Sequence, residues 1–374
     1  MDTGLRWEHN FIRKGEEFSA FWKDYLNSGS KNVCYIMGIG FDPRTNHGIN
    51  KIFSIKSDGV RKCIAFKYKK DNLIQDATPN PYVVKHTEAL EKFLKKTVNI
   101  EPVYKELVTR SDEDKSIASI NSSKIIDESD LKGMTDIVVD ISAMARSVFL
   151  PLLNKLLYLI DKQASPKQNL HIVVAENPTL DSNIKDKGVE EQMTYPHGFR
   201  ISDLAKTEDF SKIWIPILGE GQLDQFKKIN KELEPVAVCP VLPFPSINLR
   251  RGDNLINYYQ DHLFNDPDFE PSNIIYADEQ NPFQVYRMLA RTIDQYHNTF
   301  NILGGCKIVL STLSSKLMTI GAFMAFYESK KQEKIVGIAH VESIEHQLDE
   351  KCRSEHSDDD ILYEIWLTGE PYGE

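Results

Sequence analysis

The sequence of 374 residues lacks the features that mark several classes of protein. Its most apolar stretches, VFLPLLNKLLYLI and MTIGAFMAFY, are broken by polar residues or far shorter than a membrane span, so we expect no part of it to cross a bilayer. It has no long block of lysine and arginine, and its formal net charge is −10, which argues against an electrostatic track for duplex nucleic acid. Hydrophobic residues at 41% and charged residues at 27% are ordinary globular values, which excludes wholesale disorder and fibrous folds.

Cysteine is scarce and scattered. The five cysteines, Cys34, Cys63, Cys239, Cys306 and Cys352, form no C-x-x-C pair, and the N-terminal residues contain no apolar signal core, which predicts a cytoplasmic protein with reduced thiols. The ten histidines are equally dispersed, and no H-E-x-x-H spacing is present. We therefore predict no metal site, and no cofactor is indicated.

Short runs rich in valine and isoleucine alternate with segments of helical period along most of the chain. Runs such as NVCYIMGIG, TDIVVDIS, NLHIVVAE and KIWIPILGE lack the polar alternation of a strand with one wet face, so we expect them to be buried on both faces. Helices are predicted over residues 143–161, 222–233, 282–296 and 314–330. This alternation predicts an α/β, Rossmann-like fold with a mostly parallel sheet flanked by helices.

A polar segment rich in serine and aspartate, residues 111–132, stands between two series of strands and helices. We interpret it as a linker or surface loop that joins a smaller N-terminal α/β unit, residues 1–110, to a main Rossmann-like domain, residues 133–374. Five or more strands after Asp136 are then expected in one sheet, which the N-terminal unit continues or packs beside. Near the C-terminus, the runs KIVGIAHVES and ILYEIWL are predicted to pair as an antiparallel hairpin at the sheet edge.

Charged and hydroxylated residues gather where the predicted strands end. In a parallel sheet the carboxyl ends of the strands share one edge, and open α/β sheets bind ligands there, near the point where the strand order reverses. Helix capping is an alternative explanation, because aspartate, serine and asparagine are common N-caps. Capping does not require the arginines, so we expect a shared ligand site at the carboxyl edge.

The run LSTLSSKLMTIG places Ser314, Ser315 and Lys316 at the start of a predicted helix. The free backbone N–H groups of a helix start, together with a lysine, form a suitable site for an anion. The spacing is neither that of a Walker P-loop nor the S-x-x-K pattern of a nucleophilic serine. Binding of a phosphate or carboxylate and plain helix capping are the two interpretations of this run.

Two other predicted strand ends combine acidic and basic residues. GIGFDPRT contains Asp42 and Arg44, which would either contact a ribose hydroxyl and a phosphate or form a salt bridge with each other. Its G-x-G-x-x-G fingerprint is incomplete, so NAD binding is not inferred. VVDISAMAR contains Asp140, Ser142 and Arg146, and an aspartate there is costly unless it is paired, hydrated or bound to a metal. Asp42, Arg44, Ser142 and Arg146 are candidate ligand contacts.

The run NLRRGDNLI brings Arg250, Arg251 and Asp253 together after a proline-stiffened strand end, and YADEQNPF places Asp278 at another. Adjacent arginines suit bidentate recognition of an oxyanion, and we expect one to face a ligand while the other pairs with a carboxylate. Asp253 is also a residue type that caps helices. Arg250 and Arg251 are predicted to face one cavity together with Lys316 and to hold an anionic group there.

Taken together, GFDPR, WIPILGEG, CPVLPFPS with RRGD, YADEQNPFQVYR and LSSKL resemble motifs of a family of bacterial Rossmann-like proteins of undefined activity. Some members of that family are encoded in phage-defence loci. The resemblance covers most of the chain and implies a Rossmann-like fold and a setting in antiviral defence. It implies no catalytic residue.

Three functions are compatible with these patterns. We favour a binding protein that recognises a nucleotide or another phosphorylated signal and passes a conformational change to a partner subunit, because the sequence has many oxyanion donors and no evident nucleophile-base pair. One alternative is an enzyme that hydrolyses or cleaves a nucleotide-like substrate, with Asp140, Glu176 or Glu279 as acid, base or nucleophile. The other is a scaffold subunit of a protein complex whose edge loops bind protein alone.

Overall fold

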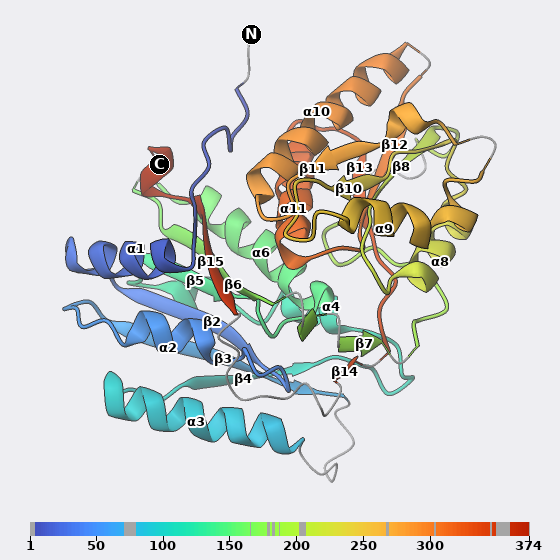
Figure 1. The fold of residues 1–374 in the computed structure, drawn as a ribbon. Coiled ribbons are helices and arrows are strands. Elements are labelled where there is room, and N and C mark those ends of the chain that lie inside the picture. Colours follow the sequence, from blue (N-terminus) through green and yellow to red (C-terminus); the bar gives the residue numbers. More distant parts are fainter. Residues whose placement is uncertain are drawn as a thin grey trace. The chain divides into compact units, whose positions relative to one another are not determined.

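In the computed structural model, the chain folds into two compact units (Figure 1). It describes residues 4–70, 80–164, 166–177, 180–181, 184–186, 188–201, 207–266, 269–302, 304–344, 346–348 and 360–373. Unit 1 comprises Met1–Asn10 and Lys185–Gln347, and unit 2 comprises Phe11–Ile184 and Leu348–Glu374. Each unit contains its own sheet, and a two-stranded sheet of β7 (Ile184–Asp186) and β14 (His346–Leu348) forms where the chain crosses between them.

Unit 2 is built on a seven-stranded sheet in the order β1-β15-β6-β5-β2-β3-β4. Its strands are β1 (Ile12–Lys14), β2 (Val33–Ile39), β3 (Arg61–Lys69), β4 (Val103–Val108), β5 (Asp136–Asp140), β6 (Asn169–Glu176) and β15 (Ile361–Thr368). Strands β2 to β6 are mutually parallel, whereas β15 runs antiparallel to β6, and β1 antiparallel to β15. In chain order the parallel strands lie third, second, first, fourth and fifth, so this is a doubly wound sheet whose order reverses between β2 and β5.

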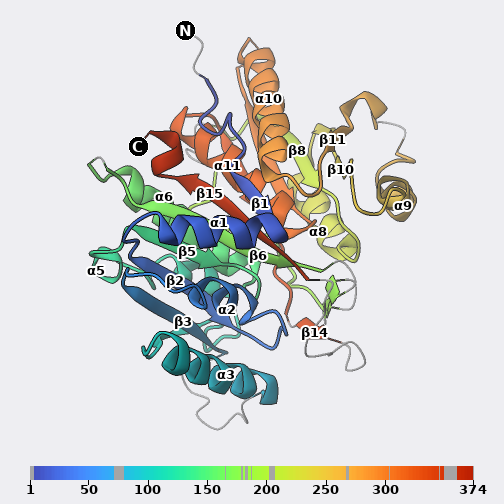
Figure 2. The ribbon, with the colours of Figure 1, turned by 60° about the vertical axis from the view of Figure 1, so that its left-hand side comes forward.

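The helices of unit 2 cover this sheet (Figure 2). They are α1 (Glu16–Asn27), α2 (His47–Phe53), α3 (Pro81–Thr97), α4 (Ala118–Ser122), α5 (Glu128–Leu131) and α6 (Arg146–Asp161), with a short 3-10 helix η4 (Glu370–Tyr372). The apolar residues of α1, α2 and α3 share one core with alternate residues of the strands, as the two-residue period of a strand requires. Helix α6 buries apolar residues along nearly its whole length.

Unit 1 repeats the same strand order in a smaller sheet, β11-β10-β8-β12-β13, with β9 also paired to β8. Its strands are β8 (Ser211–Ile217), β9 (Ala237–Val238), β10 (Val241–Pro243), β11 (Ile275–Ala277), β12 (Cys306–Thr312) and β13 (Val336–Ala339). All of these pairings are parallel, and the order reverses between β8 and β12. The helices are α8 (Leu223–Leu233), α9 (Arg251–Tyr258), α10 (Pro282–Asn301) and α11 (Lys316–Lys331), with 3-10 helices η1 (Gln260–His262) and η2 (Pro271–Asn273).

The predicted fold class is confirmed, because both units are α/β structures with mostly parallel sheets flanked by helices. The four predicted helices correspond to α6, α8, α10 and α11, and every residue of the predicted strands β2 and β5 is buried. Within the described residues, no helix is both long and apolar enough to cross a membrane.

The predicted organisation of the strands is wrong. The strands after Asp136 do not form one sheet, because β5 and β6 pair beside β2 and complete the sheet of the N-terminal strands. The compact units accordingly do not divide at residues 110 and 132, and the expected linker contains α4 and α5, whose residues Ala118 and Leu131 are buried in unit 2. The predicted C-terminal hairpin does not form either, since β13 pairs with β12 and β15 pairs with β6.

Candidate functional site

The carboxyl edge of the unit 1 sheet is closely packed where the strand order reverses, between β8 and β12. A Cβ atom added to Gly219 would lie 2.1 Å from the carbonyl oxygen of Leu313 and 2.8 Å from the Cα of Ser314. The hydroxyl of Tyr259 donates to the carbonyl oxygen of Gly219 at 2.7 Å. The last residue of each strand and the segment that leads from it to the next helix are here called the strand exit. The exits of β8 and β12 are in backbone contact at this point, and only glycine permits it.

The exit of β12 leads into helix α11 as predicted. Ser315 is the N-cap, and its hydroxyl accepts from the N–H of Met318 at 3.3 Å, while Lys316 is the first residue of the helix. Ser314 is buried, and its hydroxyl lies 3.3 Å from the sulfur of Met318. Thr312, the last residue of β12, is only 2% exposed, and its buried Oγ1 has no hydrogen-bond partner among the described residues. Helix capping by Ser315 is thus confirmed, and anion binding stays a prediction.

The exits of β10 and β11 are joined by both backbone and side chains. The N–H of Phe244 donates to the carbonyl of Ala277 at 2.8 Å, and the N–H of Glu279 donates to the carbonyl of Pro245 at 3.1 Å. An ion pair of 2.5 Å then connects Nη1 of Arg251 to Oε1 of Glu279. Arg251 Nε and Glu279 Oε2 are buried and have no partner among the described residues. The pair is therefore made through one contact, where two parallel ones are common.

The surroundings of Glu279 shift its titration. Burial raises the pKa of Glu279 above its ordinary value, and Arg251 opposes this rise. The charges of Glu220 and Asp278 raise this pKa further, whereas a hydrogen bond from the backbone of Ile247 lowers it. A buried carboxylate with two other acids nearby is a poor neighbour for a further negative charge.

Other predicted residues of this edge lie at the surface or in local turns. Arg250 is exposed, and its N–H donates to Oδ1 of Asn248 at 3.0 Å. Asp253 is exposed in the first turn of α9. Oδ1 of Asp278 accepts from the N–H of Gln280 at 2.9 Å. These contacts are local, so they fix the loops without defining a ligand.

The shared cavity of Arg250, Arg251 and Lys316 stays a prediction. Of the two roles expected for the arginines, the structure shows one, because Arg251 is the ion-pair partner of Glu279.

In unit 2, the exit of β2 is closed by its own salt bridge. Arg44 is 2% exposed, and its Nε and Nη2 donate to the two carboxylate oxygens of Asp42 at 3.0 and 2.8 Å. Its Nη2 also lies 2.8 Å from Asp181, and its Nη1 donates to the carbonyl of Ala175 at 3.2 Å. Of the two interpretations of this pair, the mutual salt bridge is therefore the one that the structure shows.

The exit of β5 is equally self-contained. Asp140 is 2% exposed and accepts from the hydroxyl of Tyr35 at 2.6 Å and from the N–H of Ser142 at 2.9 Å. The hydroxyl of Ser142 in turn accepts from the N–H of Ala175 at 2.9 Å. Helix α2 packs closely against this site. A Cβ atom added to Gly48 would lie 2.6 Å from Oδ2 of Asp140. The cost of burying this carboxylate is offset by these hydrogen bonds.

The predicted residues therefore belong to two sheets, and their assignment to one shared edge is wrong. Unit 2 contains Asp42, Arg44, Asp140, Ser142, Arg146 and Glu176, and unit 1 contains Arg250, Arg251, Asp253, Asp278, Glu279, Ser314, Ser315 and Lys316. The reason is that β5 and β6 belong to the first sheet, whereas the later strands build the second.

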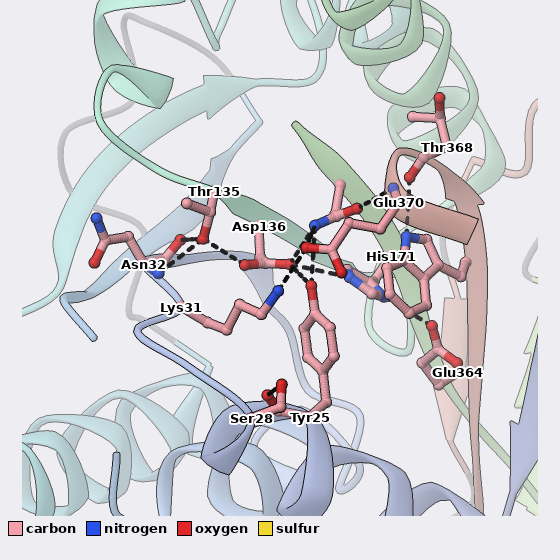
Figure 3. Close-up of polar contacts among 12 residues, drawn as sticks. Tyr25, Ser28, Lys31, Asn32, Thr135, Asp136, His171, Glu364, Thr368 and Glu370 are labelled. Carbon is pink, nitrogen blue, oxygen red and sulfur yellow. Dashed lines mark hydrogen bonds and ion pairs between the residues drawn. The ribbon is translucent and has the colours of Figure 1, made fainter. Parts of the chain in front are cut away.

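Sequence reasoning missed a buried polar cluster at the amino ends of β5 and β6 (Figure 3). His171 is fully buried, its Nδ1 lies 2.8 Å from Oε1 of Glu364, and its Nε2 lies 3.4 Å from Oδ1 of Asp136. The other oxygen of Glu364 pairs with Nη1 of Arg13 at 2.9 Å. Strands β1, β15, β6 and β5 are thus connected across the sheet by one chain of charges.

A second layer of hydrogen bonds surrounds Asp136 (Figure 3). The hydroxyl of Tyr25 donates to Oδ1 of Asp136 at 2.6 Å, and the amide of Asn169 donates to the same oxygen at 3.0 Å. The N–H of Glu370 donates to Oδ1 of Asn169 at 2.8 Å, and Lys31 pairs with Glu370 at 2.5 Å. This layer ties helices α1 and η4 to the sheet.

The charged residues of this cluster shift one another's pKa values. Burial alone would lower the pKa of His171, but the carboxylates of Asp136 and Glu364 raise it above its ordinary value. Burial would likewise raise the pKa of Asp136, but hydrogen bonding and the charge of His171 hold it below its ordinary value. Full burial closes the cluster to a substrate, so we assign it to stability. The available sequence signal was a charged residue within each of two apolar runs, NLHIVVAE and ILYEIWL.

The described residues contain no group of three or more His, Cys, Asp or Glu side chains placed to hold a metal ion. Cys34, Cys63, Cys239 and Cys306 are free and buried, and burial raises the pKa of Cys306 to about 11. This thiol is therefore protonated near neutral pH, which disfavours a nucleophilic role. Cys352 lies outside the described residues.

The fold and the strand exits define a protein with two doubly wound, Rossmann-like units. No family model and no curated protein matches the chain. Among solved structures, it is similar to a universal stress protein from Archaeoglobus fulgidus DSM 4304, with 8% identity, a TM-score of 0.22, and coverage of 82% of this chain and 94% of that one. A putative universal stress protein from Pseudomonas aeruginosa UCBPP-PA14 shows 9% identity, a TM-score of 0.22, and coverage of 83% and 92%. We draw no functional conclusion from similarities of this size.

Proposed function

We propose that unit 1 binds a nucleotide or another phosphorylated small molecule at the carboxyl edge of its sheet. One observation carries the proposal: the buried side-chain atoms without a partner in the described part of unit 1 all lie at strand exits of that edge. They are Thr312 Oγ1 at the end of β12, Arg251 Nε at the start of α9, which follows β10, and Glu279 Oε2 after β11. Open α/β sheets bind ligands at this edge.

The free-energy cost of burying polar atoms without partners supports a ligand at this edge of unit 1. A buried polar atom without a partner costs about 1–3 kcal/mol, so three of them along one edge are expensive unless something else satisfies them. At the corresponding edge of unit 2, Asn46 Oδ1 is the one buried side-chain atom without a partner among the described residues after β2 and β5, whereas Arg44 and Asp140 make their hydrogen bonds with protein groups. The proposal therefore concerns unit 1.

The phosphate is assigned to the exit of β12. Helix α11 is 16 residues long, begins at Lys316, and presents the N–H groups and positive dipole end that favour an anion. Thr312 and Ser314 add hydroxyl groups on the same exit. The exits of β10 and β11 are less suitable, because the buried carboxylate of Glu279 there already experiences the negative charges of Glu220 and Asp278.

The resemblance to bacterial Rossmann-like proteins adds a biological setting to the proposal. We propose that the ligand is a signal in cytoplasmic antiviral defence and that its binding is passed to a partner subunit. Binding is favoured over catalysis because the sequence has many oxyanion donors and no recognisable motif for a nucleophile and its base.

The test is ligand binding by the purified full chain. Isothermal titration with nucleoside triphosphates, pyrophosphate and tripolyphosphate measures the dissociation constants for the wild type, Lys316→Ala and Thr312→Val. A charge-assisted contact contributes about 1.5–3 kcal/mol, so Lys316→Ala should weaken binding roughly ten- to a hundredfold. Lys331→Ala, at the exposed far end of the same helix, is the control and should bind as the wild type does.

Two results would contradict the proposal. One is unchanged affinity in both Lys316→Ala and Thr312→Val when melting temperatures show that these variants are folded. The other is failure of every phosphorylated probe to bind, together with no small molecule in mass spectra of the purified protein.

A further inference from the structure

The Arg251–Glu279 pair leaves two adjacent hydrogen-bonding atoms unused. Its single contact joins Arg251 Nη1 to Glu279 Oε1, so the Nε–H donor of the arginine and the Oε2 acceptor of the glutamate are both buried without a partner. A fork-to-fork arrangement would have satisfied both. The pair therefore offers one donor and one acceptor to whatever lies beside it.

Backbone hydrogen bonds join the two strand exits that carry these atoms. The hydrogen bonds from Phe244 to Ala277 and from Glu279 to Pro245 tie the exits of β10 and β11 together at 2.8 and 3.1 Å. A donor and an acceptor fixed in this way can select a ligand by its pattern of hydrogen bonds.

A phosphate does not match this pattern. Phosphate oxygens are mainly acceptors, so they would satisfy Arg251 and leave Glu279 Oε2 facing a like charge. The further negative groups of Glu220 and Asp278 add to that repulsion, as their effect on Glu279 shows. A neutral group with an N–H donor beside an acceptor satisfies both atoms, and nucleobase edges present such neighbouring groups.

Two exposed aromatic rings lie close to these exits, one directly after β10 and one within β11. Phe244 is 61% exposed and Tyr276 is 49% exposed, and their ring centroids lie 6.2 Å apart in an edge-to-face arrangement. Phe244 is also the residue whose N–H binds Ala277, directly before Asp278 and Glu279. Exposed rings of this kind stack on nucleobases with little preference for sequence.

The spacing to the proposed phosphate position is suitable for one nucleotide. Strand β10 lies two strands from β12 and β11 lies three strands from it, and neighbouring strands are about 4.8 Å apart, so the exits of β10 and β11 are about 10 and 14 Å from that of β12. A ligand with its phosphate on α11 therefore reaches the Arg251–Glu279 pair with its other end.

We infer that Arg251, Glu279 and Phe244 form a nucleobase subsite, in which the ion pair reads the hydrogen-bonding edge of the base and the phenylalanine ring stacks on its face. The inference rests on the proposed function, since it places the second half of the same ligand. It assigns a nucleotide, and excludes a phosphate-only or sugar phosphate ligand.

Titrations that separate base from phosphate test the subsite. ATP, GTP, CTP and UTP are compared with tripolyphosphate, which carries the phosphates without a base, on the wild type, Glu279→Gln and Phe244→Ala. Glu279→Gln keeps the shape but puts an amide donor where Oε2 accepted, so the affinity for the best nucleotide should fall about tenfold or more. Phe244→Ala should lower the affinity for nucleotides by a similar factor.

The affinity for tripolyphosphate should stay unchanged in both variants and should already be weaker than that of the best nucleotide. Glu270→Gln, an exposed acidic residue of the same unit, is the matched control and should leave every affinity unchanged.

The outcomes distinguish the two proposals. If tripolyphosphate binds as tightly as every nucleotide, or if both subsite variants keep wild-type nucleotide affinity, the nucleobase subsite is refuted and the phosphate site stands. If neither nucleotides nor tripolyphosphate bind, the proposed function fails and the subsite fails with it.

Discussion

At the scale of single residues, His171 ties the stability of unit 2 to pH. Its pKa is raised on folding, so its contribution is fully present below the ordinary value of 6.5 and is lost as the pH rises through the folded pKa. The pKa of Asp136 is lowered, so its contribution is present above 3.8 and is lost as the pH falls through the folded pKa. The cluster is therefore most stabilising between these two ordinary values.

Replacing His171 should lower the free energy of unfolding more near pH 6 than at alkaline pH. His171→Gln removes one member of a buried ion pair, which is expected to lower the free energy of unfolding by about 3–5 kcal/mol near pH 6. The difference from the wild type should shrink toward pH 9, as measured by urea unfolding along a pH series. His262→Gln, at an exposed position, is the control. A difference that stays constant across the series would show that His171 does not carry the charge assigned to it.

Gly219 supports a second prediction at this scale. Because a Cβ atom would meet the Leu313 carbonyl at 2.1 Å, Gly219→Ala must move one of two strand exits, and we expect a loss of about 1–3 kcal/mol in unfolding free energy. Gly252→Ala is the matched control: its nearest atom would lie 3.9 Å away, and alanine favours the helix that contains it. Thermal melting of both variants is the measurement, and an equally stable Gly219→Ala would contradict the packing described.

At the scale of elements, the apolar runs were predictable and their partners were not. Strands β2 and β5 are buried along their whole length, and such runs are recognisable from composition alone. The sequence of a run that is apolar on both faces does not indicate which sheet it joins. The prediction therefore placed β5 and β6 in one sheet with the later strands, whereas they pair beside β2. The short strands β1 and β4 and the helices α1 and α3 were also missed, since they are only partly buried.

For the site, too, the positions of the residues could be predicted from the sequence and their partners could not. Residues at strand exits could be predicted, because their position depends only on where a strand ends. Their partners could not, since His171 and Glu364 are 193 positions apart, and Arg44 and Ala175 are 131 positions apart. The Asp42–Arg44 pair was foreseeable as one of two alternatives because both residues belong to a single loop.

At the scale of the whole molecule, the two units have separate cores, and two buried tryptophans report on them. Trp7 belongs to unit 1, where its ring meets Tyr286 edge-on at 5.4 Å, although it lies in the N-terminal segment. Trp22 belongs to unit 2, where its ring lies 5.0 Å from that of His171. Both tryptophans are fully buried, so they form a matched pair for testing the division of the chain.

Each tryptophan should destabilise only its own unit when it is truncated. Trp7→Ala and Trp22→Ala are each expected to cost about 3–5 kcal/mol. Hydrogen exchange followed by mass spectrometry should show faster exchange in residues 207–344 for Trp7→Ala and in residues 11–177 for Trp22→Ala. Faster exchange throughout the chain in either variant would show that the two units unfold as one.

The central claim, a ligand site at the carboxyl edge of unit 1, is tested most directly by a crystal structure of the full chain with the nucleotide that binds best in titration. We expect density for phosphate at the start of α11, beside Thr312 and Lys316, and for a base against Arg251, Glu279 and Phe244. Ordered nucleotide bound at the exits of β2 and β5 in unit 2 instead, with the unit 1 edge unaltered, would contradict it.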